Sequence, residues 1–198
     1  MNKGVRLFGL LFTVLIFSAV ARADQLVFTG SLTGSQEVPP TGSPGIGSAL
    51  VTLDTVTNLL TVNVSFSGLG NPTIASHIHC CAPPGTNAIV ATTVPTFPGF
   101  PLGVTSGTYL MTFDLTAAST YNPAFITAHG GTVAGAMAAF IAGLTSGQTY
   151  LNIHTTQFPG GEIRGQLQAS VPEPASLLLL TTGVIGAAGA LRKRRKRT

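Results

Sequence analysis

The stretch from residue 74 to residue 81 reads IASHIHCC and holds two of the chain's four histidines and both of its cysteines. In a β-strand, successive side chains point to opposite faces. His77, His79 and Cys81 would then share one face, while Ile74 and Ile78 share the other. One face can hold a metal ion and the other can pack, so we expect the domain to be organised around this strand.

The clearest strand pattern follows the same rule. Apolar residues occupy every second position from Leu60 to Phe66, with Thr61, Asn63 and Ser65 between them, which is typical of a half-buried antiparallel strand. Similar patterns predict further strands at Gln25–Ser31, Ile46–Leu53, Asn87–Thr92, Thr108–Leu115, Thr149–His154 and Glu162–Gln168. The predicted fold class is therefore all-β, an antiparallel β-sandwich or barrel.

One segment breaks the β pattern and predicts a short two-helix insertion near residues 122–143. Asn122 can cap a helix that has Pro123 at its first position, and Gly130 can end it. Thr132 can cap a second helix that runs through the alanines to Gly143. The other helices expected, at the two chain ends, are targeting segments.

The first 23 residues have the features of a signal peptide. Basic residues precede an apolar run, Leu7–Val20, and Ala21-Arg22-Ala23 fits a small-x-small cleavage site. The apolar run is short for a bilayer, which needs about 20 residues. We predict cleavage after Ala23 and an exported chain that starts at Asp24.

The last 28 residues, 171–198, resemble the PEP-CTERM sorting signal of Gram-negative bacteria that make exopolysaccharide. Pro172-Glu173-Pro174 precedes the apolar run Ala175–Leu191 and a basic end, Arg192–Arg197. As a helix, the apolar run would span roughly 25 Å, enough to hold the chain in the membrane before processing. The resemblance implies that an exosortase-type protease processes the tail near Pro172, Glu173 and Pro174. A plain membrane anchor is the alternative.

Between these ends, residues 24–170 have the length of one domain. Arg164 is the single Lys or Arg in this range and five carboxylates oppose it, so the net charge is −4 although the full chain is basic. The range lacks the basic surface of nucleic-acid-binding proteins, which excludes that class.

Cys80 and Cys81 are adjacent in a chain expected in an oxidising compartment. Neighbouring Cα atoms lie about 3.8 Å apart across a trans peptide, closer than in ordinary disulfides. A vicinal bridge would need a distorted or cis peptide. Intermolecular pairing, a vicinal bridge and metal ligation are the three alternatives.

The histidines suggest a metal site. His154 shares the phase of Tyr150 and Asn152 on the polar face of its strand, and three imidazoles from His77, His79 and His154 would suit zinc or copper. Cys81 or Glu162 would complete or orient the site. In the alternative, the histidines are structural and Glu162 forms a surface ion pair with Arg164.

Three segments occur in the order found in one family: Phe28-Thr29-Gly30 with Pro39-Pro40, then Ser76–His79, then Tyr150–Thr155 leading to Pro159–Gln166. Residues 25–168 thereby resemble the CHRD domain, first described in chordin. The resemblance implies an antiparallel β-sandwich or barrel and no established enzymatic activity. The chain departs from the family pattern in the long loop after the histidines.

These observations predict an exported, non-catalytic domain at the cell surface or in the extracellular matrix, with exopolysaccharide or surface proteins as partners and a metal as a supporting feature. The alternative is a secreted Cu/Zn redox enzyme resembling superoxide dismutase. That alternative lacks an evident full ligand set and basic residues to steer an anion.

Overall fold

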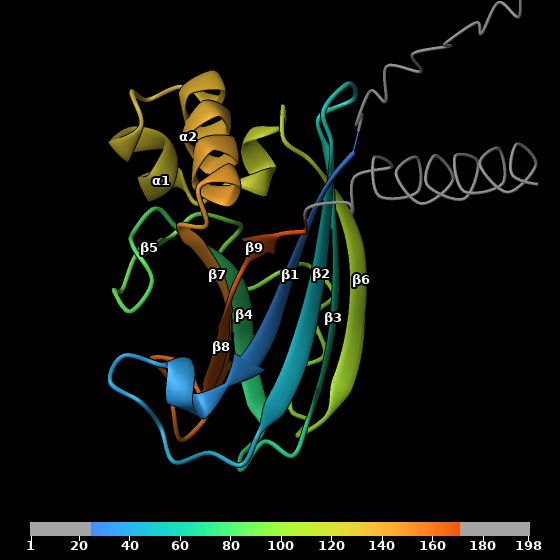
Figure 1. The fold of residues 1–198 in the computed structure, drawn as a ribbon, viewed down its shortest axis with the longest axis vertical. Coiled ribbons are helices and arrows are strands. Elements are labelled where there is room, and N and C mark those ends of the chain that lie inside the picture. Colours follow the sequence, from blue (N-terminus) through green and yellow to red (C-terminus); the bar gives the residue numbers. More distant parts are fainter. Residues whose placement is uncertain (1–24, 171–198) are drawn as a thin grey trace, which may run out of the picture.

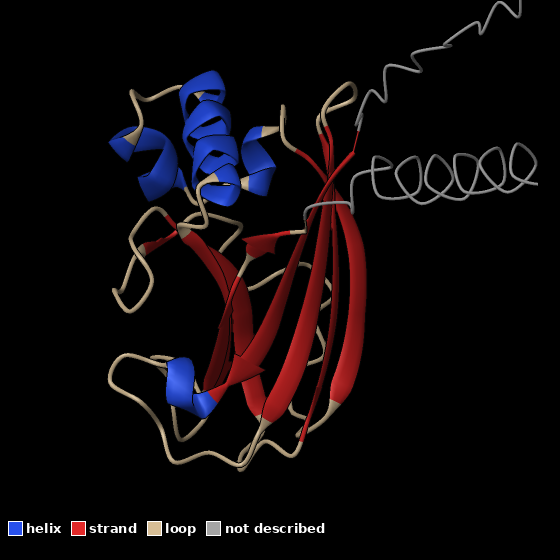
Figure 2. Ribbon diagram, viewed as in Figure 1, coloured by secondary structure: helices blue, strands red, loops and turns tan. Residues whose placement is uncertain are grey.

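The computed structural model describes residues 25–170 and shows a β domain with a helical cap at one end (Figures 1 and 2). The predicted signal peptide with Ala23, and the predicted tail with Pro172, Glu173 and Pro174, lie outside the described residues. The strands are β1 (Gln25–Thr33), β2 (Ile46–Asp54), β3 (Leu59–Ser67), β4 (Thr73–Cys80), β5 (Ile89–Val90), β6 (Gly107–Asp114), β7 (Thr149–Thr155), β8 (Ile163–Gln166) and β9 (Gln168–Ala169). The α-helices are α1 (Pro123–Ala128) and α2 (Val133–Thr145), and two 3₁₀ turns cover Gly34–Gln36 and Ala118–Thr120.

The strands form one antiparallel sheet in the order β5-β4-β7-β8-β1-β2-β3-β6, and β9 pairs with β1. The sheet curls into a half-barrel, so that β4, β7 and β8 form one wall and β1, β2, β3 and β6 the other (Figure 1). This confirms the predicted all-β class. Sequence order and spatial order differ, because β4 and β7 are neighbours although the insertion separates them in the chain.

The core fills the space inside the curl, and strand alternation places it there. Leu60, Val62 and Val64 of β3 are fully buried, and Val62 lies opposite Val51 of β2. Phe97, in the loop after β5, is also fully buried and stacks on Tyr109 with ring centroids 5.5 Å apart. The proline-rich loop therefore closes the core on this side.

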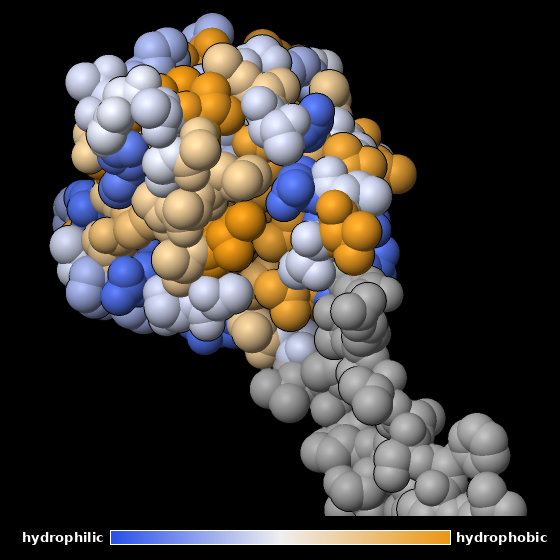
Figure 3. Space-filling view, turned by 90° about the horizontal axis from the view of Figure 1, so that it is seen from above, coloured by the Kyte–Doolittle hydropathy of each residue, from blue (hydrophilic) through white to orange (hydrophobic). Residues whose placement is uncertain are grey.

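The helical insertion forms as predicted. The side chain of Asn122 accepts a hydrogen bond from the Ala124 amide at 3.0 Å, and that of Thr132 accepts one from the Gly135 amide at 3.1 Å. Phe125 and Phe140 turn inward and are fully buried. Figure 3, which looks onto this end, shows apolar side chains among polar ones on the surface. Within residues 25–170, no helix is both long and apolar enough to span a membrane.

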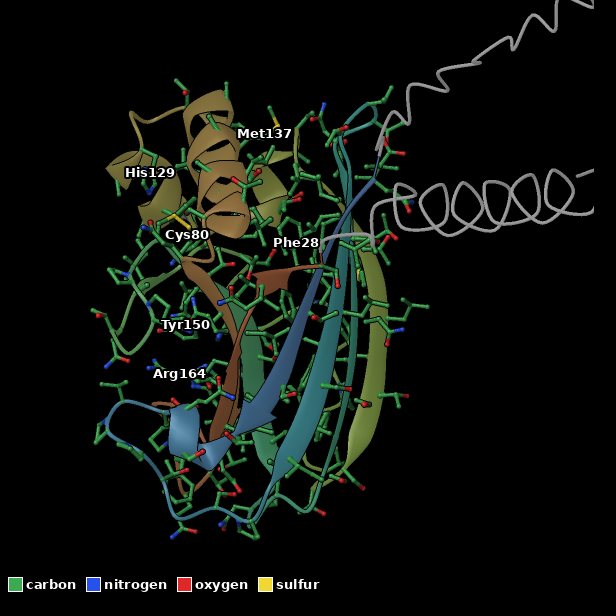
Figure 4. The ribbon with its side chains drawn as sticks, in the orientation of Figure 1. Phe28, Cys80, His129, Met137, Tyr150 and Arg164 are labelled. Atoms are coloured by element: carbon green, nitrogen blue, oxygen red, sulfur yellow. A yellow bond between two sulfur atoms is a disulfide. The ribbon has the colours of Figure 1, made fainter. Side chains whose placement is uncertain are left out.

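The adjacent cysteines form a vicinal disulfide across a cis peptide bond. Cys80 lies below α2 (Figure 4), where a Cβ atom at Gly143 would collide with both sulfur atoms. Of the three alternatives considered for the cysteines, the structure shows the vicinal bridge.

Candidate metal centre

The pairing of β4 with β7 brings three histidines together. His79 lies opposite Tyr150, His77 opposite Asn152, and Ala75 opposite His154. All three histidines are on the sheet face that points away from the apolar core, yet each is at most 8% exposed because loops cover that face. One ring nitrogen from each lies within 4.8 Å of the others. The structure therefore assembles the three histidines predicted as ligands.

A backbone carbonyl holds each imidazole ring. His77 Nε2 lies 2.6 Å from the Pro95 oxygen, His79 Nδ1 2.8 Å from that of Ala88, and His154 Nδ1 3.0 Å from that of Pro159. Two of these carbonyls, those of Ala88 and Pro95, come from the long chain segment between β4 and β6. A carbonyl oxygen only accepts hydrogen bonds, so the ring nitrogen facing it carries the hydrogen.

These hydrogen bonds leave a lone pair on the other nitrogen of each neutral ring. His77 Nδ1 and His154 Nε2 are 3.2 Å apart, and His79 Nε2 is buried with no hydrogen-bond partner among the described residues. Two nitrogens bound at about 2.0–2.1 Å to one tetrahedral zinc ion lie about 3.3 Å apart. A cation between the rings would satisfy lone pairs that otherwise face each other.

Burial keeps the rings neutral, which is their metal-binding form. Desolvation lowers the pKa of His79 and of His154 to about 4, and it also lowers the pKa of His77. The carbonyl hydrogen bonds oppose these shifts because they favour the protonated ring. At neutral pH the centre presents three unprotonated ring nitrogens.

The two additional ligands predicted from the sequence do not join this centre. Cys81 lies beyond the end of β4, where its sulfur is bonded to Cys80 and offers no thiolate. Glu162 is fully buried, but its Oε1 accepts hydrogen bonds from Ser43 Oγ at 2.5 Å and the Gly70 amide at 2.7 Å. The predicted role of Glu162 as the partner of His154 belongs instead to the Pro159 carbonyl.

Arg164 is buried beside the histidines, not on the surface. Its guanidinium lies 4.5 Å from the centroid of the Tyr150 ring, and that ring stacks on His79 with centroids 4.7 Å apart (Figure 4). It donates hydrogen bonds to the Gln36 carbonyl and to Asn87 Oδ1. The alternative of a surface ion pair between Glu162 and Arg164 is therefore wrong, because both side chains are buried with other partners.

A pocket of about 420 Å³ opens beside the centre. Its lining includes His79, Tyr150 and Glu37. Glu37 is only 5% exposed, and desolvation raises its pKa to about 7 against the opposing charge of Arg164 and a hydrogen bond with Asn152. Sequence patterns did not single out Glu37. The available signal was the scarcity of charged residues. Residues 25–170 contain only five Asp, Glu, Lys or Arg residues, and three of them are buried.

The comparisons with known proteins agree with this architecture. The family model of the CHRD domain matches residues 28–167, the greater part of the described chain. The chain belongs to the CHRD family. No curated protein and no solved structure gives a significant match. The family match therefore supports the fold, and the role of the histidines is inferred from their geometry.

The tail of this CHRD protein matches the PEP-CTERM protein-sorting motif over residues 170–195. This motif indicates export to the cell envelope of Gram-negative bacteria and processing by an exosortase-type system. The CHRD domain and its histidine centre therefore work outside the cytoplasm.

Proposed function

We propose that this CHRD protein is a non-catalytic domain of the cell surface or matrix that holds a zinc or copper ion through His77, His79 and His154. One observation carries the proposal. Three backbone carbonyls orient three buried rings, and one ring nitrogen of each lies within 4.8 Å of the others. Oriented second ring nitrogens are the usual support of metal-binding histidines.

The bound ion would join parts of the chain that are far apart in sequence. His77 and His79 belong to β4 and His154 to β7, and the carbonyls that hold them come from the loops around Ala88, Pro95 and Pro159. A ligand that binds only the folded state stabilises it by mass action. Outside the cell, such an ion would fix the covering loops to the sheet.

The test of this function is metal-linked stability. Adding zinc or copper(II) to the metal-free full-length chain should raise its thermal midpoint by several degrees, since about 1 kcal/mol shifts the midpoint by roughly 2–8 °C for domains of this size range. His154→Ala should abolish the rise. An equal rise in His154→Ala would show that the metal binds elsewhere.

Association with exopolysaccharide is the finer part of the proposal. The sorting motif supports it, as does the hydroxyl-bearing face of the other wall, where Ser48 and Ser65 are exposed and hydrogen-bonded to each other at 2.9 Å. The mature protein should remain in extracted exopolysaccharide, and a version lacking residues 171–198 should not. Equal recovery of both would contradict the association.

A redox enzyme is the second candidate, and Arg164 favours it. The positive charge of Arg164 is close enough to the histidines to contribute to lowering the pKa of His79. Such a cation would weaken the repulsion between Glu37 and a small anion that approaches a copper ion. Superoxide turnover by the copper-loaded protein above that of free copper would support the enzyme, and equal rates would exclude it.

A further inference from the structure

We propose that the pocket beside the histidine centre binds a small oxygen ligand that carries a proton, such as water, an alcohol or a hydroperoxide. Its oxygen would face the metal, and its O–H would donate to the carboxylate of Glu37. This inference rests on the proposed metal site and specifies the class of ligand that the site binds. It makes Glu37 a ligand-binding residue.

The pocket extends from one of the three histidines to Glu37. His79 and Glu37 both line it, as do Tyr150 and Gly161. No fourth Asp, Glu, His or Cys joins the group of three histidines among the described residues. Three protein ligands leave a tetrahedral ion one position for a small molecule, as in catalytic zinc sites. A ligand in this pocket would lie beside His79, one of the three proposed metal ligands.

Glu37 accepts a hydrogen bond from the Asn152 side chain, but one of its buried oxygens is left without a donor. Its Oε1 has no hydrogen-bond partner among the described residues, and neither has Asn152 Oδ1. Both groups lie against the backbone of Gly161, where a Cβ atom would come within 2.5 Å of Asn152 Oδ1 and 2.7 Å of Glu37 Oε1. Buried acceptors are normally satisfied. A ligand with a polar hydrogen would satisfy them, whereas an aprotic ligand would not.

The charge of the pocket favours a neutral ligand over an anion. Arg164 is the single Lys or Arg between residues 25 and 170, and it already donates to Gln36 and Asn87 and lies near Glu37. Glu37 is the one Asp, Glu, Lys or Arg residue among those that line the pocket. Its pKa of about 7 allows it to accept a proton as well as a hydrogen bond.

The test uses the copper(II)-loaded full-length protein, with binding followed by copper EPR. Methanol and tert-butyl hydroperoxide serve as protic probes, line broadening by ¹⁷O-labelled water reports bound water, and azide serves as an anion without a proton. Glu37→Leu should weaken the binding of at least one protic probe by about tenfold or more, because it removes a hydrogen bond to a charged group. Azide should bind to Glu37→Leu as tightly as to the wild type or more tightly, because the variant lacks the negative charge of Glu37. The protic probe that binds more tightly distinguishes an alcohol from a hydroperoxide ligand.

Two further variants secure the result. Glu37→Gln keeps the size of the side chain and should weaken the same probes less, which gives a second measurement if Glu37→Leu folds poorly. Asp114→Asn removes an exposed carboxylate from β6 and should change none of the affinities. Failure to retain copper would overturn both the metal site and this inference. Retained copper with probe affinities that do not depend on Glu37 would overturn this inference alone.

Discussion

The two walls of the half-barrel have the same strand pattern but treat their outer faces differently. On the β1-β2-β3-β6 wall, outward residues such as Ser48, Asn63 and Ser65 lie in solvent. On the β4-β7-β8 wall, the outward residues His77, Asn152 and Arg164 are at most 6% exposed, because loops cover them. Both faces carry polar side chains, but only the face of the β4-β7-β8 wall is buried in the structure.

The difference shows where polar and charged groups are buried together. Burying polar and charged groups is unfavourable unless they are paired or bind something. The covered wall buries three histidines and Arg164, and Glu37 of a covering loop is buried as well. The outward residues of the exposed wall stay in solvent and do not incur this cost. The covered wall therefore holds the candidate metal site.

The largest expected effect is the loss of stability in acid, because the histidines that acid protonates lie on the covered wall. In metal-free protein, burial lowers the pKa of His79 and His154 to about 4 from an ordinary value of 6.5. The unfolded chain binds protons first, so stability present above pH 6.5 is lost as pH falls towards 4, on the order of 3 kcal/mol per histidine.

His79→Phe should remove the part of this acid-induced loss of stability that His79 causes. The measurement is the free energy of unfolding in urea at pH 7.5 and at pH 4.5, for the wild type and for the variant. The two proteins are compared because the contribution of Glu37 changes with pH in the opposite direction and cancels in the difference. An equal loss in both proteins would show that His79 is not desolvated in the folded state.

Gly161→Ala should destabilise the protein by about 2–4 kcal/mol. Gly161 has φ +133°, and a Cβ atom there would collide with Asn152 and Glu37. Gly160→Ala is the matched control, since a Cβ atom at Gly160 meets nothing within 4 Å. It should change the free energy of unfolding by about 0.5 kcal/mol or less. Equal effects at the two glycines would contradict the packing of Glu37 on the covered wall.

Glu37→Gln should become relatively more stable as pH rises. The raised pKa of Glu37, about 7 in place of 4.5, means that its contribution is fully present below pH 4.5 and is lost as pH rises through 7. The variant should gain on the order of 1–3 kcal/mol over the wild type between pH 5 and 8. Urea unfolding at these two pH values measures the gain, and a pH-independent difference would refute the burial of an uncompensated carboxyl.

The smallest effect is expected on the exposed wall. Replacing Ser48 and Ser65 together by alanine removes their mutual hydrogen bond in solvent. The free energy of unfolding should change by about 0.5 kcal/mol or less per site. A loss above about 2 kcal/mol in thermal or urea unfolding would mean that this wall also carries a structured site.

Local patterns predicted most of the fold. The alternation from Leu60 to Phe66 fixes which side of β3 is buried, and the caps at Asn122 and Thr132 depend only on residues two or three positions away. The predicted strand Asn87–Thr92 shortens to Ile89–Val90, because Ala88 instead contacts His79 and Tyr150. That contact is not local, so no local pattern reveals it.

The candidate site was predicted only in part. The phase of His77, His79 and His154 follows from strand periodicity, but their meeting depends on β4 lying beside β7. The predictions for Cys81 and Glu162 were wrong because one forms a disulfide and the other bonds to Ser43 and Gly70. Glu37 was missed because a loop folded over the sheet decides its burial.

The most direct measurement is the metal content of the full-length protein, by mass spectrometry, after exposure to zinc or copper(II) and removal of free metal. The account predicts about one ion per chain in the wild type and in the double variant Ser48→Ala/Ser65→Ala, and loss of the ion in His77→Ala/His79→Ala. Unchanged metal content in the histidine variant, or no metal in the wild type, would contradict it.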